Sequence, residues 1–267
     1  MSASSDRYQK LMASRESDAP FCACGCGLKT KWSIRTKSYG RYLFNHQLPN
    51  LQHCWTDRID EIVRGTVLGD GHLDPRKGRS GRETGLARLA IRHSTKRQLE
   101  YARWLHTELA PITTSKLRVR ATPKAFGKEI AEFSTVSLPQ LYDIRLETYR
   151  SGIKVVTETY LDKLSDFSVA VWWCDDGSNN SFSTHSFSRD ENDMISAWLN
   201  DRYDLETWVE IDKRVNLPFI RCNSESMRTF GQRIFKFVEK SLWYKFSRFL
   251  PELLKQELSV SSQLELQ

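Results

Sequence analysis

The chain has 267 residues, enough for one large domain with an appendage or for two compact units. Its net charge of +7 and pI near 9.1 suit a polyanionic partner, and eight Lys and Arg against three acids make residues 1–55 strongly basic. The densest apolar stretch, residues 167–174, is far short of the roughly 20 residues that cross a bilayer, which excludes a membrane partner. A polar, partly acidic start argues against a signal or transit peptide. We therefore expect an intracellular, reducing compartment, either the cytoplasm or nucleoid or the matrix of an organelle that encodes the protein.

The amino-terminal part of the chain is predicted to form a flexible basic arm over residues 1–20 and a small unit over residues 21–55. Three cysteines, Cys22, Cys24 and Cys26, lie at alternate positions of this small unit. That spacing is too crowded for a typical disulfide framework and suits thiolate ligands of a metal ion.

From residue 56 to about 249 the chain shows one pattern of elements twice. In the first copy, Thr56 or Asp57 caps a helix whose apolar residues from Ile59 to Val67 follow helical spacing, and the helix stops at Gly69-Asp70-Gly71. A helix at residues 95–109 and strands at 86–93, 116–120 and 130–136 follow. The order is helix, sheet, helix, sheet.

The second copy repeats that order. Ser165 caps a helix that is apolar on nearly every side and is therefore expected to be buried, and it stops at Asp175-Asp176-Gly177. A helix with a capping box follows at Ser188 and Glu191. The remaining elements are strands at residues 182–185, 207–211 and 219–222 and a helix at 226–238.

Each copy ends its first helix on an aspartate that precedes a glycine, and the two carboxylates, Asp70 and Asp176, are 176−70 = 106 residues apart. A single Asp-Gly pair is more often only a turn. A carboxylate at a helix C-terminus faces the negative end of the helix dipole, so a nearby cation would stabilise it. If the two helices pack side by side, both carboxylates project from the same end and can hold divalent cations such as Mg²⁺.

The two segments that carry these aspartates, residues 63–71 and 169–177, resemble the two motifs of single-chain, double-motif LAGLIDADG homing endonucleases. Further similarity lies in Lys154, which precedes the second motif, and in His93 and His185, which follow the motifs near a helix start. The resemblance covers about residues 56–250. It implies an α+β fold of two pseudo-symmetric αββαββα halves, residues 56–160 and 161–250, with antiparallel DNA-binding sheets, followed by a tail over residues 251–267.

The resemblance also implies a metal site. The last acid of each motif binds metal in the family, which corresponds to Asp70 and Asp176, and the preceding backbone carbonyl helps, here that of Gly69 and that of Asp175. Two positions depart from the family pattern: Arg64 stands where a small or apolar residue is usual, and Val171 replaces a small residue of the helix contact.

Residues that organise the attacking water fall on the first strand pair of each half in this family, so His93 and His185 are the candidates. A structural histidine that caps the next helix is the alternative for each. The family's pocket lysine has no clear counterpart at residues 134–137 or 222–225. Lys154, Lys213 and Lys128 are possible substitutes, and each could equally be a surface charge.

For DNA contact, Lys116, Arg118 and Arg120 alternate along one expected strand and so lie on one face, as do Arg88 and Arg92 on another. Such a face can enter a major groove, and an exposed polar strand is the alternative. The basic loop over residues 76–82 can contact phosphates or remain solvated.

The small unit at residues 21–55 resembles a short zinc-binding module that accompanies some nucleases. This resemblance implies a tetrahedral site made by Cys22, Cys24, Cys26 and His46, with His53 and Cys54 as competing ligands. Reduced structural thiols are the alternative.

These features predict a monomeric enzyme that hydrolyses both strands of a double-stranded DNA site with Mg²⁺ as cofactor and Zn²⁺ as a structural ion. The alternative is a protein that binds nucleic acid without cutting it, such as an RNA maturase or a transcription regulator. An HNH nuclease is disfavoured because the chain has six histidines and no evident two-histidine finger.

Overall fold

The structure is a computed structural model, and it describes residues 19–21, 29–30, 32–33, 38–40, 54–122 and 129–254. The chain divides into two compact units, residues 1–55 and 56–267. In the first unit, the short strands β1 (Trp32–Ser33) and β2 (Ser38–Tyr39) pair antiparallel, and the rings of Trp32 and Tyr39 meet edge to face. The expected zinc ligands Cys22, Cys24, Cys26 and His46 lie outside the described residues.

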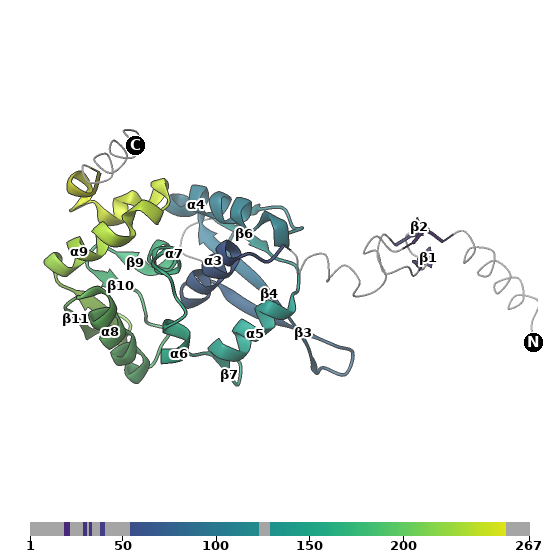
Figure 1. Cartoon of the computed structure of the whole chain (residues 1–267), viewed down its shortest axis with the longest axis horizontal. Coiled ribbons are helices and arrows are strands. Elements are labelled where there is room, and N and C mark those ends of the chain that lie inside the picture. Colours follow the sequence, from purple (N-terminus) through teal and green to yellow (C-terminus); the bar gives the residue numbers. More distant parts are fainter. Residues whose placement is uncertain are drawn as a thin grey trace, which may run out of the picture. The chain divides into compact units, whose positions relative to one another are not determined.

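Two helices, α3 (Asp57–Leu68) and α7 (Asp166–Asp176), lie side by side at the centre of the second unit (Figure 1). The side chains of Thr56 and Ser165 cap them, each accepting a hydrogen bond from the backbone N–H three residues on, at 3.3 and 3.1 Å. Residues 167–175 of α7 are all buried, which confirms the expectation of a buried second helix.

The first half continues from α3 into a four-stranded antiparallel sheet of order β3-β4-β6-β5, with helices between and after the strand pairs. Its elements are β3 (His72–Lys77), β4 (Glu83–Ser94), α4 (Thr95–Glu108), the 3₁₀ turn η1 (Ala110–Ile112), β5 (Arg118–Ala121), β6 (Glu129–Ser134) and α5 (Pro139–Thr148). A two-stranded ribbon and a short helix lead to the second half: β7 (Tyr149–Arg150), β8 (Ile153–Lys154) and α6 (Glu158–Leu161).

The second half repeats the arrangement from α7, with a four-stranded antiparallel sheet of order β11-β12-β10-β9. Its elements are β9 (Gly177–Ser178), β10 (Ser181–Phe182), α8 (Arg189–Tyr203), β11 (Thr207–Asp212), β12 (Leu217–Cys222), α9 (Ser224–Ile234), η2 (Phe235–Phe237) and η3 (Lys240–Phe246). The fold is therefore α+β, with two αββαββα halves, as the sequence predicted. Within the described ranges, no helix has the length and apolar character that a membrane crossing requires.

Some local elements differ from the sequence-based expectation. Strand β3 was not expected, because it contains Pro75, which removes a strand hydrogen-bond donor. Helix α5 was missed because it begins at Pro139, although proline is well tolerated in a first helical turn. The strand expected at residues 182–185 is confined to β10, because the buried Asn192 side chain donates to the Thr184 carbonyl and bends the chain into a turn.

The contact between α3 and α7 depends on two glycines. A Cβ added at Gly65 would lie 2.2 Å from the carbonyl oxygen of Ser168 and 2.8 Å from the Cβ of Val171, and one at Gly69 would lie 2.5 Å from the Cβ of Asp175. Gly65 thus makes the room that lets Val171 stand where the family usually has a small residue. The two helix backbones approach closely because one of them carries no side chain at the crossing.

We predict that Gly65→Ala destabilises the protein, because the added methyl must push α7 away from α3. Overpacking of a filled core costs about 1–3 kcal/mol, and chemical unfolding followed by circular dichroism measures the loss. Gly78→Ala is the matched control, because its Cβ would meet nothing nearer than 3.6 Å. Equal stability of the two variants would contradict the proposed role of the helix contact.

Candidate functional site

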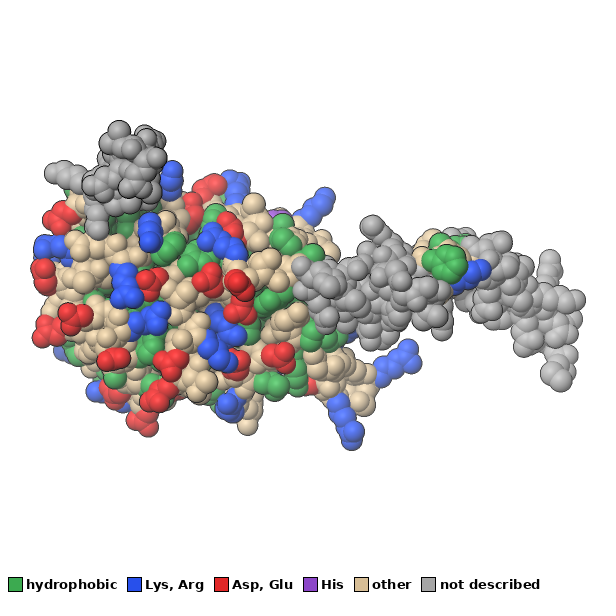
Figure 2. All heavy atoms as spheres, viewed as in Figure 1, with side chains coloured by type: hydrophobic (Ala, Val, Ile, Leu, Met, Phe, Trp, Pro, Cys, Tyr) green, Lys and Arg blue, Asp and Glu red, His purple; other side chains and the backbone are tan. Residues whose placement is uncertain are grey.

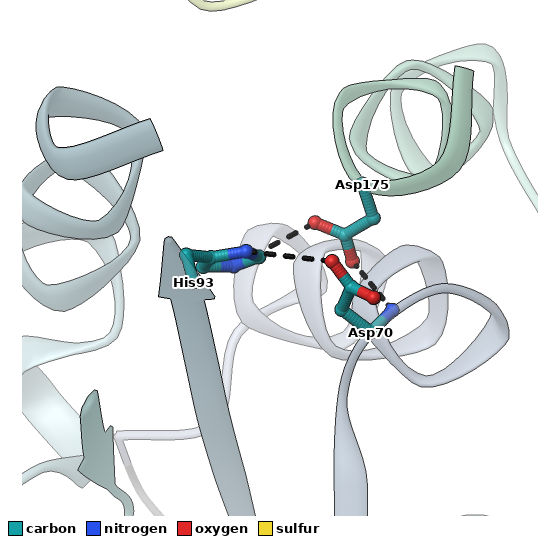
Figure 3. A group of neighbouring side chains, drawn as sticks. All are labelled: Asp70, His93 and Asp175. Carbon is teal, nitrogen blue, oxygen red and sulfur yellow. Dashed lines mark hydrogen bonds and ion pairs between the residues drawn. The ribbon is translucent and has the colours of Figure 1, made fainter. Parts of the chain in front are cut away.

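The carboxyl ends of α3 and α7 meet beside strand β4, and there the side chains of Asp70, His93 and Asp175 converge (Figure 3). His93 Nδ1 lies 3.5 Å from Asp70 Oδ2, and His93 Nε2 lies 3.8 Å from Asp175 Oδ1. The other Asp175 oxygen, Oδ2, accepts a hydrogen bond of 3.1 Å from the backbone N–H of Asp70. One carboxylate from each central helix therefore faces a single imidazole ring.

The two neighbouring aspartates of α7 differ in their surroundings. The Asp175 side chain is fully buried, and burial raises its pKa to about 7. Asp176 Oδ2 accepts a hydrogen bond of 3.2 Å from the indole of Trp172, on the same helix. Burial, helped by the carboxylates of Asp70 and Asp175, raises the pKa of Asp176 well above its usual range. The three carboxylates therefore repel one another, as expected of a site that holds a cation.

Two lysines reach the carboxyl ends of the central helices from opposite halves of the chain. Lys154 Nζ donates to the carbonyls of Gly69 at 2.7 Å and Gly71 at 2.9 Å, and Lys245 Nζ donates to those of Cys174 at 2.6 Å and Asp175 at 3.0 Å. Burial lowers the pKa of both lysines, while the nearby carboxylates act in the opposite direction. Each lysine therefore offsets the negative end of one helix dipole.

The expected carbonyl ligands of the metal, those of Gly69 and Asp175, thus each accept a hydrogen bond from a lysine. A carbonyl oxygen has two lone pairs, so this bond leaves one for a cation. The lysines also bring positive charge close to the three aspartates.

Two cavities open onto the aspartates. One of about 430 Å³ is lined by Asp70, His93, Arg92 and Arg120. The other, of about 860 Å³, is lined by Asp176, Lys245 and groups from both halves. Ser94 and Gln98, in the first turn region of α4, line both cavities, so the two spaces are neighbours.

Other expected site residues lie elsewhere. His185 stacks on the ring of Phe219, with centroids 5.3 Å apart, and its Nε2 lies 3.4 Å from Asp212 Oδ2. Lys213 is exposed in the turn between β11 and β12, and Lys128 lies outside the described residues. Of the three candidate lysines, the structure brings Lys154 to the aspartates.

The expected DNA-contacting arginines share one face of the first sheet. Arg88 and Arg92 are exposed on β4, and Arg118 and Arg120 are exposed on β5. Lys116 is exposed just before β5 rather than within it. Two carboxylates on this face form ion pairs with the arginines.

Asp74 and Glu132 are those carboxylates. Asp74 lies 3.2 Å from Arg88, while Glu132 lies 2.8 Å from Arg120 and 3.4 Å from Arg92. The pKa of Glu132 is lowered, first of all by its hydrogen bond from Arg120.

The second sheet presents different chemistry on the corresponding strands. Trp208 and Leu217 are 47% and 43% exposed on β11 and β12, and Arg221 is paired with Glu210 at 3.0 Å. Figure 2 shows basic and acidic side chains interspersed over the visible face of the larger unit, so the positive charge does not gather into one patch there. The two sheets therefore present unequal surfaces.

Sequence reasoning missed two residues of the site. Lys245 was overlooked because it lies 245−176 = 69 residues after its aspartate, whereas Lys154 lies 154−70 = 84 residues after its own, so the repeat does not align them. In the sequence, Lys245 could have been noticed as the one charged residue within the apolar stretch over residues 242–246. The Asp175 carboxylate was overlooked because only the backbone carbonyl of that residue was expected to take part.

Two αββαββα halves thus surround a pair of central helices, with an aspartate just past the end of α3 and another at the end of α7. The profile of the LAGLIDADG DNA endonuclease family matches residues 60–230, more than half of the chain. The chain belongs to this family.

The chain is similar in sequence to mRNA maturases and to RecA proteins. It is 24% identical to the cytochrome b mRNA maturase bI2 of Saccharomyces cerevisiae over 72% of this chain and 48% of the maturase, and 24% identical to that of Debaryomyces hansenii over 71% and 74%. It is 33% identical to the protein RecA of Mycolicibacterium flavescens over 47% of this chain and 27% of RecA. The chain thus spans about half of the first maturase and about a quarter of RecA.

Among solved structures, the homing endonuclease I-WcaI bound to its DNA recognition sequence superposes with a TM-score of 0.64. The match covers 76% of this chain and 92% of that protein, at 16% sequence identity. This similarity shows the shared fold.

We predict that Glu132→Gln strengthens binding to random-sequence duplex DNA, because it removes the carboxylate that pairs with Arg92 and Arg120. The change frees up to two cations for phosphates, so affinity should fall more steeply with salt than in the wild type. Fluorescence anisotropy across a salt series measures both effects. Glu225→Gln, an exposed change on α9, is the control; weaker DNA binding by Glu132→Gln would contradict this assignment of the surface.

Proposed function

We propose that this protein is a site-specific DNA endonuclease that makes a metal-dependent double-strand break in a long target site. The observation that carries the proposal is the meeting of the two acid-bearing helix ends, with Asp70, Asp175 and Asp176 next to Lys154 and Lys245. Membership of the LAGLIDADG DNA endonuclease family supports it. We also propose that residues 56–160 and 161–250 each serve one half of the DNA site and that the chain acts as a monomer.

The residues present fit a divalent cation such as Mg²⁺. Asp175 Oδ1 is buried and has no hydrogen-bond partner among the described residues, and the Asp70 side chain is 44% exposed toward solvent. Asp70 and Asp176 would hold the ions, with help from the carbonyls of Gly69 and Asp175. A bound cation supplies activation of water and stabilisation of the leaving oxygen.

The chain's own groups have separate roles in this proposal. Lys154 and Lys245 orient the helix ends and attract a phosphate to them. His93 would organise water at the first centre, and Ser183, which lines the cavity of Asp176, would do so at the second. Arg88, Arg92, Lys116, Arg118 and Arg120 would contact the DNA.

A second candidate is an RNA maturase without DNA cleavage. It is supported by the similarity to two cytochrome b mRNA maturases, which covers about 70% of this chain in each case. In that case the exposed Trp208 would suit stacking on an unpaired base. Absence of cleavage by the wild type at its validated site, together with specific RNA binding, would favour this function.

For the nuclease, we predict that Asp70→Asn and Asp176→Asn each bind the target DNA but do not cut it. The substitution keeps the size of the side chain and removes the charge that holds the cation. If both acids share a metal, either variant should lose cleavage of both strands. A supercoiled plasmid with the target site, incubated with Mg²⁺, reports nicked and linear products.

Asp201→Asn is the control for those two variants, because Asp201 is an exposed residue of α8. It should linearise the plasmid as the wild type does. Full linearisation by Asp70→Asn or Asp176→Asn would exclude that acid from the mechanism.

We also propose that Cys22, Cys24, Cys26 and His46 bind one structural zinc ion, and we predict one zinc per purified chain. Elemental analysis of protein prepared without chelators measures it. Zinc content should fall in the double variant Cys24→Ser, Cys26→Ser. Its absence from the wild type, or an unchanged content in the double variant, would disprove the site.

A further inference from the structure

We propose that Asp70, His93 and Asp175 form a binding site for one first-row transition-metal ion such as Mn²⁺. One ring nitrogen and two carboxylate oxygens would be its protein ligands, a different set from the Asp70 and Asp176 pair of the proposed nuclease. The metal binding itself does not depend on cleavage, whereas its use in catalysis rests on the proposed function.

The three groups are already assembled for one ion. Their ligand atoms all lie within 4.8 Å of one another, and they come from three separate elements: the end of α3, strand β4 and helix α7 (Figure 3). Asp70 opens into the cavity of about 430 Å³, which provides a path for entry.

The polar atoms that face the site lack other partners. Both ring nitrogens of His93 and Asp175 Oδ1 are buried without a hydrogen bond to any described residue. The side chains of His93 and Asp175 are both 0% exposed. Buried polar atoms are nearly always hydrogen-bonded, whereas the nitrogens of this ring contact the two carboxylates only at ion-pair distances of 3.5 and 3.8 Å, which points to a missing ligand among the three groups.

The surroundings hold the ligands in place. Asp175 Oδ2 is bonded to the backbone N–H of Asp70, which leaves Oδ1 directed at the ring. The His93 ring packs against the ring of Tyr101, with centroids 5.1 Å apart. Such outer contacts orient the ligands of known metal sites and raise their affinity.

The donor set selects the kind of metal. Mg²⁺ takes oxygen ligands and dehydrates reluctantly, whereas an imidazole nitrogen with two carboxylates suits Mn²⁺ and the later ions of the first transition row. A site with this nitrogen ligand should therefore bind Mn²⁺ more tightly than Mg²⁺.

This site belongs to the first half alone. His72 lies two residues after Asp70 and pairs with Ala90 on β4, whereas Gly177 lies one residue after Asp176 and pairs with Phe182 on β10. When Asp70 is aligned with Asp176, His93 therefore corresponds to Thr184. The Thr184 hydroxyl is engaged with Asn192 and cannot replace an imidazole. Among the described residues no second cluster of three metal-ligating side chains occurs.

The decisive experiment is pulsed electron paramagnetic resonance of the full chain with one equivalent of Mn²⁺. Coordination by His93 gives modulation from a directly bound ¹⁴N nucleus, which oxygen ligands cannot produce. The cysteines of residues 21–55 do not compete, because thiolates select softer ions than Mn²⁺. Wild-type protein that binds Mn²⁺ without ¹⁴N modulation overturns the proposal.

Variants assign the nitrogen. His93→Gln should abolish the ¹⁴N modulation. It should also raise the Kd for Mn²⁺ about tenfold or more, because changes to residues that only support a metal ligand already cost that much. Asp175→Asn should raise the Kd by a similar factor, and it keeps the acceptor for the Asp70 N–H. The control is His72→Gln, because His72 also lies near an aspartate, with 3.2 Å from its Nε2 to Asp74 Oδ1, but its side chain is 55% exposed.

The results separate this inference from the nuclease function. Retention of the nitrogen signal in His93→Gln, or its loss in His72→Gln, would overturn the site. His93-dependent ¹⁴N modulation without DNA cleavage would support the metal site and contradict the proposed nuclease function. DNA cleavage with Mg²⁺ and without ¹⁴N modulation would support the nuclease function and contradict the metal site.

Discussion

The close approach of α3 to α7 across Gly65 and Gly69 is the constraint on which the rest of the site depends. It brings together two helix C-termini, each the negative end of a dipole, and with them the carboxylates of Asp70, Asp175 and Asp176. Nothing about that concentration of negative charge favours folding by itself. It is tolerated because α7 also buries a large apolar surface within the second half, where Trp172 and Trp173 pack on the ring of Phe182.

Two lysines and one backbone N–H offset part of the repulsion. Lys154 and Lys245 each bond to carbonyls of one helix end, and the Asp70 N–H bonds to Asp175. Both lysines are largely buried, and their lowered pKa values show that burial outweighs the attraction of the carboxylates. A bound cation would neutralise the negative charge that remains. The helix ends therefore have the arrangement that the proposed cation site requires.

The sequence was sufficient for the frame of the fold and for part of the site. Caps at Thr56, Ser165 and Ser188 and the apolar helix α7 are local signals, and their helices lie where those signals predicted. Strand β3 and helix α5 were missed because proline masks both. The partnership of Asp175 with His93 could not be predicted, because it depends on how the two helices cross. Lys245 reaches the site from a 3₁₀ turn whose spacing differs from that of Lys154, so comparison of the two repeats cannot find it.

The two halves share a fold and differ in chemistry, which fusion into one chain makes possible. In a symmetric dimer, a change that suits one DNA strand is imposed on both. Here the first centre has His93 between two carboxylates, and the second has Asp176 bonded to Trp172. The first sheet carries four exposed arginines, three of which pair with Asp74 or Glu132, while the second carries Arg221, paired with Glu210, beside an exposed Trp208. In the proposed nuclease, phosphate contacts would therefore come mainly from the first half. The second half is better suited to apolar contacts such as those with thymine methyl groups, so the two ends of a bound site would differ in salt dependence.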